Sequence, residues 1–179
     1  MLRVPPGRWT VDPIHSSVGF KIKHMMIATV RGQFSEFEGT IVAAKDDPAN
    51  SHAMGTVKVA SIDTGNADRD AHLRSPDFFD AERYPNITFE STRIRHIDGG
   101  TFSLAGNLTI KEVTREVEME ARVEGTDTDP WGMQRVGISV RGTINRTDFG
   151  LKWQERLAAG GMLVGEDVTI QIDISAIRN

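Results

Sequence analysis

The chain has 179 residues, of which 39% are hydrophobic and 26% charged; this composition is typical of one globular domain and excludes a disordered chain. Its net charge of −4 gives no sign of the basic surface that a nucleic-acid-binding protein needs. Because it contains no cysteine, disulfide bonds, thiolate catalysis and cysteine-bound metals are excluded.

The first residues predict a loose arm and no targeting signal. Pro5, Pro6 and Gly7 favour an irregular backbone, so we expect residues 1–8 to form a flexible N-terminal arm and residues 9–179 to form a single domain. The same stretch has no apolar run long enough for a signal-peptide core, and no run of about 18 apolar residues occurs elsewhere. We therefore expect a cytoplasmic protein without an integral membrane segment.

The segments that follow alternate apolar and polar residues with the period of two that is typical of β-strands. In the longest of them the phase slips between Phe34 and Phe37, which predicts a bulge or a bend. The strands predicted in this half of the chain are Trp9–Asp12, Ser16–His24, Thr29–Ala44 and Gly55–Asp63.

A charged segment then interrupts the strands and predicts a short helical stretch near residues 66–80. Asn66 is a good N-cap for a helix that begins at Ala67, because its side chain can accept a hydrogen bond from a free backbone N–H. Ser75 followed by Pro76 predicts the start of a second helical turn.

Further alternating strands complete the chain, giving about eight in all. A sheet with one dry face must close or fold over to bury it, so the pattern predicts an all-β antiparallel sandwich or barrel. About eight strands is the size at which a closed barrel can just enclose one ligand. The strands predicted here are Asn86–His96, Thr101–Ile110, Arg115–Gly125, Arg135–Asn145 and Val168–Ala176.

No pattern in the sequence points to catalysis or to a metal. There is no Gly-x-Ser-x-Gly turn, and a solvated surface explains the aspartates Asp63, Asp70 and Asp77 more simply than acid–base chemistry does. The histidines show no helical metal-ligand spacing. We expect neither an enzyme nor a bound metal or cofactor.

Short motifs spread over nearly the whole chain match, in order, those of one known family. They are Trp9-Thr-Val-Asp12 with His15-Ser16, Gly32-Gln-Phe34 with Phe37-Glu-Gly39, Ser61-Ile-Asp-Thr-Gly65, Arg69-Asp70, His72-Leu-Arg-Ser75, Asp77-Phe-Phe-Asp80, Tyr84-Pro-Asn-Ile-Thr-Phe89, Gly106-Asn-Leu-Thr-Ile110, Val113-Thr114, Arg146-Thr-Asp-Phe-Gly150 and Val164-Gly165. With these motifs the chain resembles the YceI-like, or polyisoprenoid-binding, family of lipocalin-like barrels.

The resemblance implies an eight-stranded antiparallel lipocalin-like β-barrel that holds an isoprenoid lipid in an apolar tunnel. The implied ligand is of the polyprenyl phosphate or isoprenoid quinone type, and the implied role is binding, with transport or storage. Members of the family are not thought of as catalytic and are often dimeric, so a homodimer is expected. Many are periplasmic and carry a signal peptide, a pattern from which this sequence departs.

Within such a barrel, the inward positions of the strands and the apolar side chains of the helical segment would line the tunnel. Arginine pairs with phosphate through two parallel hydrogen bonds, so Arg69, His72 and Arg74 are candidates for the lipid head group unless the aspartates of the same segment hold them in ion pairs. The predicted lining residues are Val18, Phe20, Ile22, Met25, Met26, Phe34, Val57, Val59, Leu73, Phe78, Phe79, Phe89, Phe102, Leu104, Leu108, Met119, Ile138 and Trp153.

Two alternatives to a lipid carrier stay open at this point. The same barrel could be an isomerase or cyclase acting on a small apolar substrate, and an inward pair of titratable side chains would favour that interpretation. It could also have a solid core, as small barrels commonly do, and serve as an interaction or stress-response module.

Overall fold

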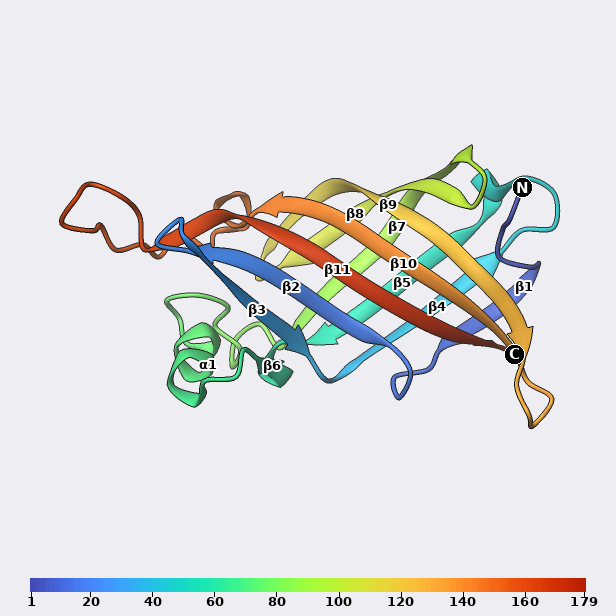
Figure 1. Cartoon of the computed structure of the whole chain (residues 1–179), viewed down its shortest axis with the longest axis horizontal. Coiled ribbons are helices and arrows are strands. Elements are labelled where there is room, and N and C mark those ends of the chain that lie inside the picture. The colour runs from blue at the N-terminus through green and yellow to red at the C-terminus, as the bar shows by residue number, and fades with distance from the viewer.

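The computed structural model describes all 179 residues and shows one antiparallel sheet of eleven strands. Eight of these strands close into an elongated barrel, because the last strand pairs back to the first (Figure 1). In hydrogen-bonded order they are β1 (Gly7–Val11), β4 (Phe37–Ala43), β5 (His52–Lys58), β7 (Asn86–Asp98), β8 (Thr101–Ile110), β9 (Val113–Thr128), β10 (Gln134–Asn145) and β11 (Val164–Arg178). The predicted all-β barrel is therefore confirmed.

The other three strands extend the sheet beyond the closed part. β2 (Ser17–His24) pairs with the first half of β11, β3 (Ala28–Phe34) pairs with β2, and β6 (Ile62–Asp63) pairs with β3. Together β1 and β2 cover the length of β11, as one strand bent between them would. The bend predicted from the phase slip is the short break that separates β3 from β4.

The helical interruption is shorter than predicted. α1 (Ala67–Arg74) begins where expected, and the Asn66 side chain accepts a hydrogen bond of 2.9 Å from the Arg69 backbone N–H. No second helical turn follows Ser75, so that prediction is wrong. The backbone N–H groups of Phe78 and Asp80 both donate to the Ser75 carbonyl, which closes a tight turn in place of a helix. α1 lies beside β6, below β2 and β3 (Figure 1).

The N-terminal residues cross the end of the barrel that lies opposite α1 (Figure 1). The Leu2 N–H donates to the Gly99 carbonyl at 3.1 Å, and the Arg3 guanidinium donates to the carbonyls of Lys45 and Asp46. β1 begins at Gly7, two residues before the predicted strand. The predicted division into a flexible arm (1–8) and one domain (9–179) stays a prediction, although these contacts place the arm against the barrel.

The barrel interior holds two packed clusters and an open space that both of them line. Only 27 of the 179 residues are buried, although every strand of the barrel has an apolar inner face. Ile170, Ile172 and Ile174 of β11 face inward yet stay partly exposed, because they face empty space. The two packed clusters comprise Trp9, Ala43, Phe102, Leu104, Met119, Val123, Val136, Ile138, Val140 and Ala176, and then Phe78, Leu108, Ile110, Phe149 and Leu151.

An ion-pair network fastens the β9–β10 loop to the bend between β1 and β2. The Arg135 guanidinium donates to Asp12 and to Asp129, each at 2.8 Å, and His15 Nδ1 lies 2.8 Å from the same Asp12 oxygen. The hydrogen bond from Arg135 is the largest cause that lowers the pKa of Asp12 from 3.8 to about 2. Arg135 also lowers the pKa of Asp129.

We predict that this network makes the fold sensitive to acid. Because the pKa of Asp12 is lower in the folded chain than in the unfolded chain, ionised Asp12 stabilises the fold above about pH 4. That stabilisation, at most about 2 kcal/mol, is lost as the pH falls from about 4 to about 2. Urea unfolding at pH 6 and at pH 2.5 measures the loss. In Asp12→Asn the loss should be smaller, with only the contribution of Asp129 remaining from this network; an unchanged loss would contradict the assignment.

Candidate functional site

A long apolar cavity occupies the unpacked interior of the barrel. Its volume is about 550 Å³, and 38 of the 54 residues that line it are hydrophobic. It extends from Val4 and Ala44, near the N-terminal residues, to Trp153 and Leu163 at the end where α1 lies. Its size falls in the range of about 300–1,000 Å³ that is usual for small-molecule sites. The interior is therefore hollow, and the solid-core alternative is wrong.

Most of the predicted lining residues face this cavity, because strand alternation turns every second side chain inward. Some of them, such as Leu104 and Met119, are also part of a packed cluster and contact the cavity with one side only. The predicted residues that lie at the cavity are Val18, Phe20, Ile22, Phe34, Val57, Leu73, Phe78, Phe79, Phe89, Phe102, Leu104, Leu108, Met119, Ile138 and Trp153.

Three predicted lining residues lie elsewhere. Val59 is buried, but β5 ends at Lys58 and a 3₁₀ turn over Val59–Ser61 takes its side chain out of the strand alternation. Met25 and Met26 form the turn between β2 and β3, beyond the wall of the barrel, where their side chains are 39% and 56% exposed.

Two of the three head-group candidates lie at the α1 end of the cavity. Arg69 lines it, and its guanidinium donates to the Thr64 hydroxyl and to the Thr64 carbonyl, both at 2.7 Å. No carboxylate forms an ion pair with Arg69. The neighbouring Asp70 accepts hydrogen bonds from the backbone N–H and the hydroxyl of Thr64. Arg74, at the last position of α1, does not line the cavity.

His72 is held in one orientation at the same end. Its Nε2 lies 2.8 Å from the Asp77 carboxylate, and its ring packs edge-on against Phe78 and Trp153, with centroid distances of 5.1 and 4.8 Å. As the alternative predicted, an aspartate is therefore the partner of His72, whereas none is the partner of Arg69. The two side chains give the apolar cavity a polar rim.

Arg146 is a buried cation in the cavity wall and is not among the predicted site residues. It is 3% exposed, and its guanidinium donates to the carbonyls of Gly165, Leu151, Trp153 and Val164. Burial lowers the pKa of Arg146. A signal was present in the sequence: Arg146 continues the inward phase of Val136, Ile138, Val140, Gly142 and Ile144.

Comparison with known proteins identifies relatives along almost the whole chain. The model of the YceI-like domain family matches residues 9–176. The YceI protein of Escherichia coli O157:H7 is 38% identical over 138 residues, which are 77% of this chain and 72% of that protein. A UPF0312 protein of Staphylococcus aureus N315 is 35% identical over 164 residues, which are 91% of this chain and 93% of that protein.

Solved structures share the barrel. Burkholderia cenocepacia BcnA superposes with a TM-score of 0.81 at 25% identity, covering 92% of this chain and 98% of that one. The Campylobacter jejuni YceI protein gives 0.73 at 30% identity, covering 89% and 91%. A polyisoprenoid-binding domain from Saccharophagus degradans gives 0.74, covering 96% and 98%, and at 14% identity it shows likeness of fold alone.

Proposed function

The chain belongs to the YceI-like family, and from this premise we propose that it binds an isoprenoid lipid whose hydrocarbon tail lies in the barrel cavity. The observation that carries the proposal is the continuous apolar cavity of about 550 Å³ along the barrel. The Saccharophagus domain, described as polyisoprenoid-binding, has the same fold and agrees with this proposal.

The physical basis is the transfer of a hydrocarbon from water to a dry wall. Each Å² of apolar surface removed from water stabilises the complex by about 25 cal/mol, so a tail that buries on the order of 400 Å² gains about 10 kcal/mol. The ordering of the tail and the loss of its free motion oppose this gain. A net affinity remains without any specific polar contact along the tunnel, and the polar rim serves only the head group.

For the head group we propose Arg69, with His72 beside it. Arg69 lies at the cavity with no carboxylate paired to it, so its positive charge is available to a polyprenyl phosphate or to the polar ring of a quinone. Arg74 loses its candidacy, because its side chain does not reach the cavity.

The direct test is native mass spectrometry of the purified protein, followed by organic extraction. We expect a retained hydrocarbon-rich lipid that leaves the barrel on extraction and is identified as an isoprenoid by its repeating mass. A protein that carries no lipid as purified, and that takes up neither a polyprenyl phosphate nor an isoprenoid quinone when offered one, would overturn the proposal.

Removal of the Arg69 charge is expected to weaken binding of a phosphate-headed lipid about tenfold. A hydrogen bond to a charged group contributes about 1.5–3 kcal/mol. At this exposed rim, water can replace part of the interaction that the variant loses. The measurement compares Arg69→Gln with the parent for a polyprenyl phosphate and for the matching polyprenol. Arg74→Gln, five residues further along α1 and off the cavity, is the control; equal effects of the two substitutions would contradict the role of Arg69.

The cavity gives little support to the enzyme alternative. Glu38 is the only carboxylate among its lining residues, and it is exposed. His72 forms a pair with Asp77 at the rim, but Asp77 itself does not line the cavity, so no acid and base stand together inside the tunnel. Transport or storage of the lipid and a homodimer stay predictions.

A further inference from the structure

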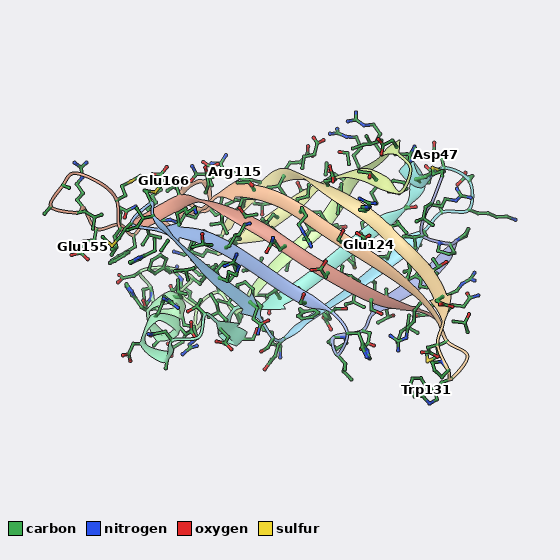
Figure 2. The ribbon with its side chains drawn as sticks, in the orientation of Figure 1. Asp47, Arg115, Glu124, Trp131, Glu155 and Glu166 are labelled. Atoms are coloured by element: carbon green, nitrogen blue, oxygen red, sulfur yellow. The ribbon has the colours of Figure 1, made fainter.

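The turn between β2 and β3 carries apolar side chains that the barrel does not bury. Met25, Met26 and Ile27 are 39%, 56% and 80% exposed, and we call these three residues the hairpin tip. The tip lies at the barrel end that also carries the loop with Glu155, opposite the end with Trp131 (Figures 1 and 2). The Met25 N–H donates to the Leu163 carbonyl at 2.8 Å, which fastens the tip to that loop. Binding of a tail inside the cavity does not use it.

The backbone of the hairpin tip is unfavourable for the residues that it carries. Met25 and Met26 have φ angles of 53° and 60°, in the left-handed region that glycine and asparagine adopt more readily than other residues. Methionine in this region costs conformational energy. Because both side chains are exposed to water, burial of apolar surface does not offset that cost. Stability of the barrel therefore does not account for an apolar tip.

The two strands that carry the tip are basic. Residues 17–34, which form β2, the tip and β3, include Lys21, Lys23 and Arg31 and no aspartate or glutamate. With the adjacent residues 152–167 there are five basic and three acidic residues, a net charge of +2 in a chain whose overall charge is −4. An apolar tip followed by long basic side chains is the pattern with which peripheral proteins enter the interface of an anionic bilayer.

The cavity reaches the base of this tip. Lys23, His24 and Leu163 line it here, whereas the N-terminal residues cross the opposite end of the barrel. A surface on which the tip rests would thus lie next to the end of the cavity that carries the polar rim with Arg69 and His72.

We propose that the hairpin tip docks the protein on an anionic lipid bilayer, with Met25, Met26 and Ile27 entering the interface and Lys21, Lys23 and Arg31 facing the lipid head groups. This proposal rests on the proposed function, because a protein that binds an isoprenoid lipid has to meet that lipid in the bilayer in which it is dissolved. Docking there lets a tail move between bilayer and cavity with little contact with water.

The test is flotation of the intact protein with vesicles of phosphatidylcholine and phosphatidylglycerol. We expect the parent to float. In Met26→Ser/Ile27→Ser the affinity for vesicles should fall at least about tenfold, because two apolar side chains no longer enter the interface. Ile14→Ser/Trp131→Ser is the matched control, because those side chains are 86% and 82% exposed elsewhere on the barrel. It should float like the parent. Lys21→Gln/Arg31→Gln should weaken binding to these vesicles and not to phosphatidylcholine alone.

The outcomes separate docking from cargo binding. A parent that does not float, or that floats no better than the tip variant, would overturn the docking proposal, as would dimerisation of the parent through the tip in place of flotation. Native mass spectrometry of the tip variant should still find any lipid that the parent retains. Vesicle docking without any retained lipid would instead count against the cavity and leave the tip proposal standing.

Discussion

Replacing Ile172 with tryptophan is expected to stop the retention of a lipid tail while the barrel stays folded. Ile172 lies in the middle of β11, opposite Val18 on one side and Val140 on the other, and lines the cavity. The indole ring would occupy space that a tail needs. Because it enters a void, it displaces few packed neighbours, and overpacking of the kind that costs about 1–3 kcal/mol in a filled core is largely avoided.

Native mass spectrometry and urea unfolding together measure this result. We expect at least about tenfold less retained lipid, since a displaced stretch of tail loses its apolar burial at about 25 cal/mol per Å². The control is Gln171→Trp, the same change one residue away on the outward face, outside the cavity wall. Full retention in a folded Ile172→Trp protein would show that the tail lies elsewhere.

The wall of the cavity could be predicted from the sequence because one local rule decides it. In a strand the side chains alternate between two faces, so the phase of Val18, Phe20 and Ile22 indicates which residues face inward whatever their partners are. The start of α1 was equally local, since the Asn66 cap depends on an N–H group three residues away. Such features need no knowledge of the distant chain.

The errors lie where a distant contact overrides the local pattern. Val59 continues the alternation of β5 in the sequence, but its backbone N–H donates to the Pro85 carbonyl at 3.0 Å, and the chain turns there. Met25 and Met26 are apolar and follow an inward-facing series, yet the strand has already turned back to pair Lys23 with Thr29. Neither the turn position nor its partner can be derived from the adjacent residues alone.

Arg146 shows both sides of this limit. The alternation of β10 indicates an inward arginine, which is unusual enough in an apolar wall to mark a site. Its four carbonyl partners come from Leu151–Gly165, a stretch with weak periodicity whose path the sequence does not specify. The position was therefore predictable, and the structure that surrounds it was not.

Arg146→Met is expected to be the most destabilising of the substitutions considered, by about 3–5 kcal/mol. The guanidinium donates to four backbone carbonyls, and these hydrogen bonds offset the free energy lost when the charge leaves water. Methionine fills similar space without any donor, so carbonyls of Leu151 and Gly165 are left without this partner. Urea unfolding followed by circular dichroism gives the loss in free energy of unfolding.

A second arginine on the same strand provides the control. Arg141 is 43% exposed, pairs with Asp173 and donates to the carbonyls of Val140 and Ile172 on the outer surface. An ion pair there contributes about 0–1 kcal/mol and water can replace the lost donor, so Arg141→Met should change stability little. Because Arg146 holds the segment that carries Trp153, its loss should also open residues 152–163 to proteolysis before the barrel unfolds. Cleavage there in Arg146→Met and not in Arg141→Met would show that one buried cation shapes the rim of the cavity; equal stability of the two variants would show that the carbonyls find other donors.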